Sequence, residues 1–212
     1  ARAGVAAAGG RFRADVVPIG VAGRNGAMPR VAADEQPGPE TSLGALARLK
    51  PVFQEDGTVT AGNAPAVNDG ATAILLMSAV EARRRDLPVL AQWVAYGESA
   101  ADTPYLATVP ASSIQAALKK AGLVVSDVDL FEINEAFAAV ACTATDLLGV
   151  DEERVNVDGG ALAVGHPIGA SGARILMHLV YELRRRKGSY GAAGICSGMA
   201  QGEATIVRIA AA

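Results

Sequence analysis

The sequence predicts an α/β fold in which helices cover a mixed five-stranded sheet. Half of the 212 residues are hydrophobic, which is enough for a sizeable core. From residue 88 onward, short apolar runs alternate with longer helical segments, as in parallel strands joined by crossover helices. The last two runs are separated only by the turn from Gly198 to Gly202, so they should pair as a hairpin. We therefore expect a mostly parallel sheet with an antiparallel pair at its end.

The strands and helices follow one another in the order β-α-β-α-β-α-β-β. Pro110 fits the first turn of a helix, and Gly122 and Gly149 are natural helix stops. The expected strands are Val89 to Tyr96, Val128 to Ile133, Val155 to Val157, Ala192 to Cys196 and Ala204 to Ile209. The expected helices are Pro110 to Ala121, Glu135 to Leu148 and about Ser171 to Arg186.

Residues 1 to about 65 show too little apolar patterning for an independent domain, so we expect them to pack on another part of the protein. One short strand is expected between Val16 and Val21. The Pro- and Gly-rich segment from Met28 to Thr41 should be a loop, and Ser42 to Leu49 a short helix. The apolar run from Ala71 to Met77 suits a buried strand that continues into a helix, although periodicity alone does not decide it.

Composition excludes several classes of protein. A net charge of −3 offers no basic surface for nucleic acid, and no apolar run approaches the ~20 residues that span a membrane. Two cysteines are too few for a disulfide framework. We expect a soluble, cytoplasmic protein. The arginine clusters at 83–85 and 184–186 should complement the negative ends of helices. The chain starts in an apparent helix without methionine, which suggests a fragment, a processed chain or a piece of a longer protein.

Three unusual segments follow strands and should meet at one edge of the sheet, where ligands of α/β proteins usually bind. They are Asn134-Glu135, the loop Gly159–Gly172, and Cys196-Ser197-Gly198. This convergence is the main argument from the residues themselves for a functional site.

The loop Gly159–Gly172 holds five glycines and one histidine, His166, and leads into a helix. Glycines allow close approach of the backbone to a ligand, and a helix start favours negative charge. A lone histidine is more often structural, but its fixed position here favours a general base or an oxyanion hydrogen-bond donor. The lysine of a phosphate loop is absent. His178, three turns into the next helix, is interpreted as a packing or surface residue.

Two other residue types remain open to more than one interpretation. Cys196 ends an apolar strand, where it is either a buried structural cysteine or a thiol that a neighbouring histidine activates. Cys142 lies inside a helix and is expected in the core. Asn134 is either a helix N-cap or an amide that holds a water against a substrate oxygen, while Glu135 can orient its neighbours. No metal-ligand spacing is present.

Together these segments resemble the thiolase family. NEAFA at Asn134–Ala138, GHPIGASG at Gly165–Gly172 and the Cys196–Gly198 turn occur in thiolase-like order and spacing. The segments Gly57–Asn63 and Asn68–Ala71 are also similar to thiolases, so the resemblance covers essentially the whole chain. The strand and helix order above is that of one core domain of the family.

The resemblance implies an acyltransferase that cleaves 3-ketoacyl-CoA or condenses acyl-CoA molecules by Claisen chemistry. His166 would activate a nucleophilic cysteine and line an oxyanion hole, in which Asn134 would hold a water. Cys196 would be the acid and base at the substrate α-carbon. Gly198 would give a backbone N–H to a second oxyanion hole.

The resemblance also implies ligands and partners. Ala64, Pro65 and Gly165 would lie at the coenzyme A site, with coenzyme A and acyl-CoA as substrates and no permanently bound cofactor or metal. The family predicts a homo-oligomer, either a dimer or a tetramer, and a role in fatty acid metabolism such as β-oxidation. The implied domains are part of the coenzyme A-binding loop domain at 1–67, the last strand and helix of the N-terminal domain at 68–87, and the C-terminal domain at 88–212.

The chain departs from the family pattern in informative places. The nucleophilic cysteine of thiolases belongs to an N-terminal half that this chain lacks, so we expect the chain to be inactive alone. Many members have two glycines where this chain has Met199 and Ala200, and a serine where it has Pro65. Residues 102–110 replace a methionine-glycine segment, so acyl-chain preference does not carry over.

Two other functions compete with the acyltransferase. A non-catalytic thiolase-fold subunit or scaffold is possible in principle, but it would not need His166, Asn134, Cys196 and Gly198 together. A ketosynthase-like condensing enzyme shares the fold, but GHPIGASG followed by a C-x-G turn argues against it.

Overall fold

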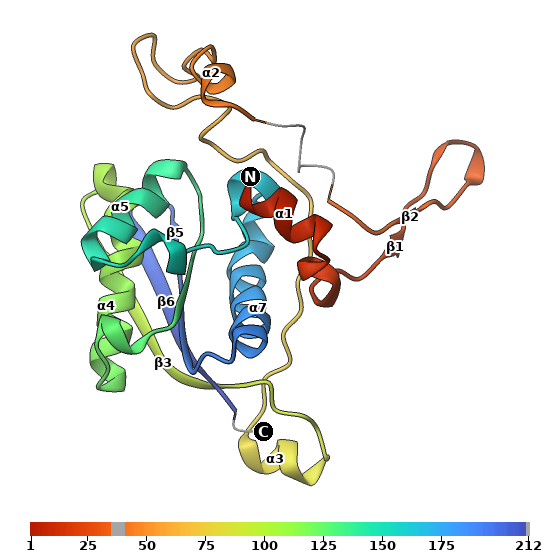
Figure 1. Ribbon diagram of the computed structural model, residues 1–212, viewed down its shortest axis with the longest axis vertical. Coiled ribbons are helices and arrows are strands. Elements are labelled where there is room, and N and C mark those ends of the chain that lie inside the picture. Colours follow the sequence, from red (N-terminus) through yellow and green to blue (C-terminus); the bar gives the residue numbers. More distant parts are fainter. Residues whose placement is uncertain (35–40, 211–212) are drawn as a thin grey trace.

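The computed structural model describes residues 1–34 and 41–210, and its core is a four-stranded mixed sheet of order β3-β6-β5-β4 (Figure 1). The strands are β3 Ala91–Ala100, β4 Leu130–Ile133, β5 Tyr190–Ser197 and β6 Gln201–Ile209. The β5–β6 hairpin is confirmed. The expectation of a mostly parallel sheet is wrong in its pairings, because β6 inserts between β3 and β5 and pairs antiparallel with both. Only β4 and β5 pair in parallel.

The fifth expected strand, Val155 to Val157, is reduced to a single bridge between Val155 and Phe131. Asn156 adopts a left-handed φ of 46°, which ends the extended backbone. Its side chain takes the place of a strand instead: Oδ1 accepts from Ile133 N and Nδ2 donates to Ile133 O, both at 2.8 Å. The predicted five-stranded sheet therefore has four strands, with an asparagine amide completing one edge.

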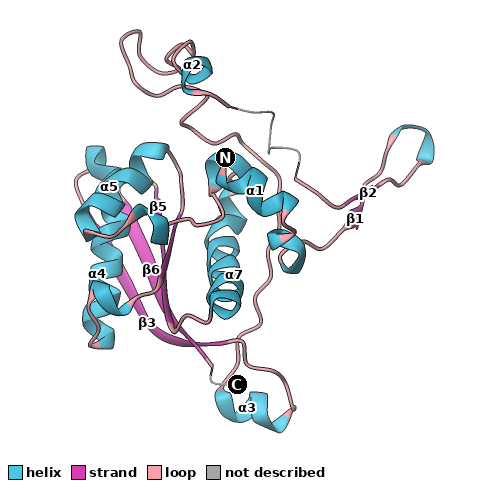
Figure 2. Ribbon diagram, viewed as in Figure 1, coloured by secondary structure: helices cyan, strands magenta, loops and turns pink. Residues whose placement is uncertain are grey.

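Helices cover both faces of the sheet, as the α/β class requires. Helices α4 (Val109–Ala121) and α5 (Ala138–Leu148) lie on one face, and α7 (Ile168–Arg186) lies on the other (Figures 1 and 2). Gly122 and Gly149 end α4 and α5 in the left-handed conformation that the sequence predicted. Each face has its own apolar core, centred on Ile114 and Phe131 under α4 and on Leu179 and Leu183 under α7.

Glycine at one position of β3 lets α4 lie directly on the sheet. A Cβ atom on Gly97 would stand 2.2 Å from Ser113 O and 2.5 Å from Ala117 N. Both atoms belong to the backbone of α4, so neither can move without shifting the helix. This contact sets the distance between α4 and the central strands.

The first 90 residues contain only short elements, as expected. They are α1 Arg2–Ala8, β1 Ile19–Gly20, β2 Arg30–Val31, α2 Leu43–Leu46 and α3 Ala79–Arg84, with 3₁₀ turns at Arg11–Ala14 and Arg24–Gly26. The strand expected between Val16 and Val21 is only two residues long. The segment 28–41, which was expected to be a loop, contains the two-residue strand β2. Residues 35–40 of that segment lie outside the described part of the chain. The helix predicted at Ser42 is confirmed but shorter, with Ser42 as its N-cap. The hairpin of β1 and β2 and, separately, helix α2 extend away from the sheet (Figure 2).

The apolar run Ala71–Met77 forms neither a buried strand nor a helix. It pairs with no strand in the described part of the chain, and Leu75 and Leu76 are 77% and 65% exposed. The remaining short helices are Thr103–Thr108, Val125–Asp127 and Glu152–Arg154, which are 3₁₀, and α6 Ala161–Val164. Within residues 1–34 and 41–210, no helix combines the length and apolar character that crossing a membrane requires.

Replacing Gly97 with alanine should destabilise the chain strongly, because the added methyl group would overlap the α4 backbone. Overpacking of this kind costs about 3 kcal/mol, so thermal unfolding should occur roughly 6–12 °C lower. Gly4→Ala is the matched control, since its new methyl group meets no atom within 4 Å in α1 and alanine favours a helix. Equal melting temperatures for the two variants would contradict the close contact.

Candidate active site

The three predicted segments do meet at one edge of the sheet. Asn134 follows β4, and its backbone N–H donates to Gly194 O of β5 at 2.9 Å. Cys196, two residues further along β5, packs in a cluster that includes Ala136 and Phe137. The loop before α7 brings His166 to the same place, where its ring contacts Asn134. The sheet edge thus collects residues that lie more than sixty positions apart.

His166 has a hydrogen-bond partner at each ring nitrogen. Nε2 lies 3.3 Å from Asn134 Nδ2, and Nδ1 lies 2.6 Å from Ser171 Oγ. The Ser171 hydroxyl proton goes to Pro167 O at 3.0 Å, so Oγ must accept from His166 Nδ1. Nε2 then carries the lone pair and accepts from the Asn134 amide. The network therefore fixes a neutral imidazole whose basic nitrogen is Nε2.

The charge state of His166 agrees with this network. Partial burial lowers the pKa of His166 below its ordinary value, and the positive charge of Arg174 lowers it further. The ring is consequently unprotonated at neutral pH. A neutral imidazole whose lone pair lies on Nε2 is suited to general-base chemistry when a substrate group takes the place of the Asn134 amide.

Asn134 does not cap a helix. Helix α5 begins at Ala138 with Phe137 as its N-cap, so the capping interpretation of Asn134 is wrong. Its side chain is completely buried, and its Oδ1 atom accepts no hydrogen bond from the described residues. A buried amide oxygen without a partner is costly unless a water or ligand satisfies it.

The two cysteines differ in surroundings. Cys196 is only 8% exposed, and burial raises the pKa of its thiol, so the thiol stays protonated at neutral pH. Cys142 was expected in the core, but it is exposed on the outer side of α5. Helical periodicity explains the error: Val140 and Ala144 face inward on this helix, and Cys142 lies between them on the opposite side.

The turn after Cys196 keeps an unusual backbone. Met199 and Ala200 have left-handed φ angles of 61° and 53° at the two positions where thiolases often have glycine. Side chains in this region cost roughly 1–2 kcal/mol per residue. The turn therefore retains the shape that glycine would allow, and a Cβ on Gly198 would meet open space.

A second loop supports His166 from the other side. Val67 forms a parallel bridge with His166, and Asn68 Oδ1 accepts from His166 N at 3.1 Å. Gly165 has a φ of 96°, and a Cβ there would lie 2.6 Å from the Asn68 side chain. The half-buried residues Ala64 and Pro65 shortly precede this bridge in the chain.

Sequence reasoning missed Ser171 and Asn68 as partners of His166. A serine five positions after a histidine carries no recognisable signal until the helix start is known. The suggestion that Glu135 orients its neighbours fits the structure, since its carboxylate accepts from Leu162 N at 2.9 Å and from Asn156 Nδ2 at 3.1 Å. Two surface hollows, of about 290 Å³ beside Phe53 and about 570 Å³ beside Lys187, include none of the site residues.

Comparison with known proteins identifies the family. Residues 87–209 match the thiolase C-terminal domain, and residues 1–80 match the thiolase N-terminal domain. The chain belongs to the thiolase family. The predicted resemblance is thus confirmed, and the α/β fold class with it.

Individual thiolase relatives agree in sequence and structure. Acetyl-CoA acetyltransferase of Pseudomonas aeruginosa is 49% identical over 196 residues, which are 92% of this chain and 50% of that protein. The cytosolic acetyl-CoA acetyltransferase of Mus musculus is 45% identical over 201 residues, 94% of this chain and 50% of that protein.

Solved thiolases overlay on nearly the whole chain. Human mitochondrial 3-ketoacyl-CoA thiolase superimposes with a TM-score of 0.94 at 43% identity, covering 99% of this chain and 52% of that one. The same enzyme in complex with CoA gives 0.92 at 41% identity, with 99% and 52% coverage. The chain therefore spans about half the length of the relatives it matches.

Removing the Ser171 hydroxyl should disturb the tautomer of His166, because Nδ1–H would lose its buried acceptor. In Ser171→Ala we expect the ratio of Nδ1–H to Nε2–H imidazole to fall about fivefold, the value of one ordinary hydrogen bond. Ring-nitrogen NMR measures this directly, since the chain has only two histidines.

Ser113→Ala is the matched control for this measurement. Ser113 is also completely buried near the start of a helix, and it donates to a proline carbonyl at 3.0 Å, but it contacts no histidine. An unchanged tautomer ratio in Ser171→Ala would show that Ser171 does not determine the tautomer of His166.

Proposed function

We propose that this chain supplies the acid-base and oxyanion half of a thiolase active site, for thiolytic cleavage of 3-ketoacyl-CoA or Claisen condensation of acyl-CoA. The observation that carries the proposal is the contact of neutral His166 with buried Asn134, at the same sheet edge as the protonated thiol of Cys196. Claisen chemistry requires a base, an acid and hydrogen-bond donors beside a thioester, and this edge holds those groups.

His166 and Cys196 divide the proton transfers in this proposal. His166 Nε2 takes the proton of the nucleophilic cysteine, which belongs to the half of the protein that this chain lacks. In cleavage, the Cys196 thiol gives its proton to the substrate α-carbon after the carbon–carbon bond breaks. In condensation, the Cys196 thiol first gives its proton to the departing coenzyme A thiolate, and the Cys196 thiolate then removes a proton from the α-carbon of the second acyl-CoA. Burial keeps the thiol protonated until the substrate arrives.

Asn134 and Gly198 are proposed to stabilise the negative oxygens. A water that donates one hydrogen to the free Asn134 Oδ1 has a second hydrogen for a substrate oxygen. Gly198 is exposed and the space where a Cβ would project is open, which supports access of a substrate to this turn. Loss of one donor from an oxyanion hole typically lowers the rate by about 10²–10³.

Coenzyme A is proposed to bind along Ala64, Pro65 and Gly165, and the bridge between Val67 and His166, which follow these residues in the chain, supports this proposal. In this proposal residues 1–67 belong to the coenzyme A-binding loop domain, 68–87 to the N-terminal domain and 88–212 to the C-terminal domain. The exposed run Ala71–Met77 supports a covering N-terminal half, since such an apolar segment is stable when buried. A cytoplasmic homo-oligomer is part of the same proposal.

Activity should appear only when the site is completed. We expect no cleavage of acetoacetyl-CoA by the 212-residue chain, because Cys142 is exposed on α5 and does not replace the missing nucleophile. Adding the N-terminal half of a close thiolase relative should restore thiolysis, measured by loss of acetoacetyl-CoA absorbance.

Two variants of the completed enzyme make this test specific. His166→Ala should lower kcat by about 10²–10⁴, the usual contribution of a general base, whereas Cys142→Ser should have no effect. Turnover by the chain alone would refute the half-site. A completed protein that binds acyl-CoA but stays inactive would favour the scaffold instead.

The pH dependence of the completed enzyme should reflect the two shifted groups. The rate should fall at low pH only as His166 becomes protonated, below its ordinary pKa of 6.5, because burial and Arg174 lower that pKa. The alkaline limb should lie above 9.0, because burial raises the pKa of the Cys196 thiol. A measured kcat profile with either limb inside 6.5–9.0 would contradict the roles given to these residues.

A further inference from the structure

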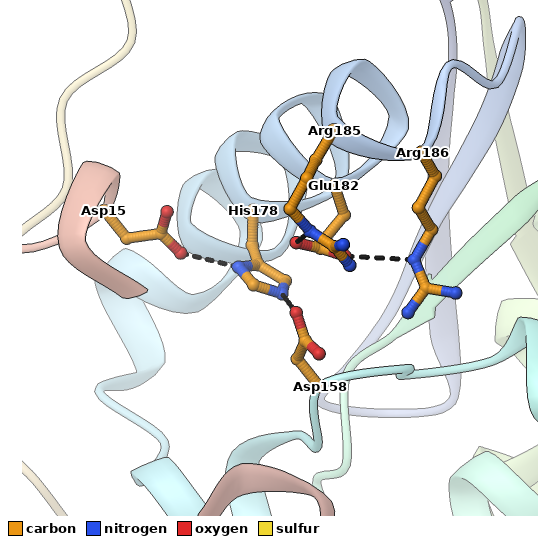
Figure 3. A network of polar contacts seen from close by, with 6 residues as sticks. All are labelled: Asp15, Asp158, His178, Glu182, Arg185 and Arg186. Carbon is orange, nitrogen blue, oxygen red and sulfur yellow. Dashed lines mark hydrogen bonds and ion pairs between the residues drawn. The ribbon is translucent and has the colours of Figure 1, made fainter. Parts of the chain in front are cut away.

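A buried ionic cluster lies behind the candidate site, around the second histidine (Figure 3). His178 of α7 is only 1% exposed. Its Nδ1 lies 2.6 Å from Asp15 Oδ2, and its Nε2 lies 3.5 Å from Asp158 Oδ2. The second contact is an ion pair that is not counted as a hydrogen bond. Of the two predicted roles for His178, packing or surface, its burial supports packing, and neither role anticipated this charge.

His178 is a cation at neutral pH. Burial alone would lower its pKa, but the carboxylates of Asp15, Asp158 and Glu132 outweigh burial and raise the pKa to about 10. Both ring nitrogens therefore carry protons, and each points at a carboxylate from a different segment. One ring thus places its single positive charge between two acidic groups that would otherwise be buried together.

Several other charged groups also surround the His178 ring. Glu182 of α7 is paired with Arg185, and with Arg186 at 3.1 Å, so two arginines already neutralise it (Figure 3). The remaining charged groups that face the cluster are Arg11 of the first 3₁₀ turn, Glu132 of β4, Glu135 after β4 and Arg174 of α7.

The Asp15 side of the cluster fixes the N-terminal segment. Phe12 packs on the His178 ring with centroids 5.4 Å apart. Upstream, a Cβ on Gly159 would lie 2.9 Å from Ala3 Cβ, so α1 rests directly on the start of the catalytic loop. Arg2 also donates to Val155 O at 2.8 Å. Residues 1–15 therefore contact both His178 and the chain leading into the loop.

The Asp158 side of the cluster leads to His166. Asp158 immediately precedes Gly159–Gly172, the loop that carries His166. At Gly160 a Cβ would stand 2.4 Å from the Glu135 carboxyl carbon, and that carboxylate accepts from Leu162 N. The loop root is thus held between Asp158 on one side and the Asn134-Glu135 segment on the other.

We propose that His178 is a positioning residue for the His166 loop, acting as a buried clamp that joins Asp15 of the N-terminal segment to Asp158 at the loop root. The value of the clamp for catalysis rests on the proposed thiolase function. The existence of the clamp does not rest on that function, because the clamp is a property of the folded chain. Without the cation, Asp15 and Asp158 would be buried unpaired near Glu132, and the loop root would move to hydrate them.

The test is backbone hydrogen exchange on the 212-residue chain without substrate. His178→Gln keeps a similar shape and hydrogen-bonding capacity but removes the charge. We expect exchange of the loop amides 160–166 to speed up about tenfold or more, while β6 amides such as Ile206 stay within about twofold. Arg184→Gln is the matched control, because it removes an exposed cation from the same helix.

A second variant separates the charge from the fold. In His178→Gln with Asp158→Asn the cation and one carboxylate are lost together, so loop protection should return to within about threefold of the original chain. Ring-nitrogen NMR should show His178 as an imidazolium at pH 8. In the completed enzyme, His178→Gln should lower kcat by about tenfold with little change in KM, and the double variant should recover it.

Several results would overturn the clamp. They are unchanged exchange of the loop in His178→Gln, equal acceleration throughout the chain, no rescue by Asp158→Asn, and a neutral His178 ring at pH 8. Because exchange and NMR need no turnover, a failed clamp is distinguishable from a failed thiolase assignment. Loss of protection in the loop with an inactive completed enzyme would support the clamp and reject only the function.

Discussion

The contact between Asn134 Nδ2 and His166 Nε2 is the interaction on which the candidate site depends. It joins the end of β4 to a glycine-rich loop that is distant in sequence, and it is possible only because the parallel β4–β5 pair sets the position of Asn134. Ser171 then fixes the other side of the ring from the first turn of α7. Sheet, loop and helix therefore each hold one part of a single imidazole.

Burial decides the protonation state of each reactive group at this edge. It lowers the pKa of His166 and raises that of Cys196, which leaves a neutral imidazole and a protonated thiol at this edge at neutral pH. Behind them, His178 keeps its proton despite deeper burial, because carboxylates surround it. The two histidines of this chain thus have opposite charge states for one electrostatic reason: only one of them faces acidic partners.

The differences between prediction and structure share a cause. Asn134 looks like a helix cap in the sequence, but α5 starts four residues later and frees its amide for His166. Val155 to Val157 look like a strand, but Asn156 turns the backbone and completes the sheet edge with its side chain. Cys142 looks buried, but it falls on the outer face of α5. In each case an element begins or ends a few residues from where the sequence suggests, or a residue falls on the other face of a helix. Such a small difference decides whether the side chain is buried or exposed and which groups it contacts.

The sequence by itself determined the α/β class, the closing hairpin, the helix stops at Gly122 and Gly149, and the meeting of the segments that carry His166, Asn134 and Cys196 at one sheet edge. Local signals suffice for these features, because glycine conformation, apolar periodicity and distinctive motifs act over a few residues. Only the tertiary structure decided that β6 separates β3 from β5, that Ser171 and Asn68 hold His166, and that Asp15 and Asp158 share the charge of His178. These contacts join residues that lie close together only after the sheet and its helices have packed, and neither spacing nor composition records them.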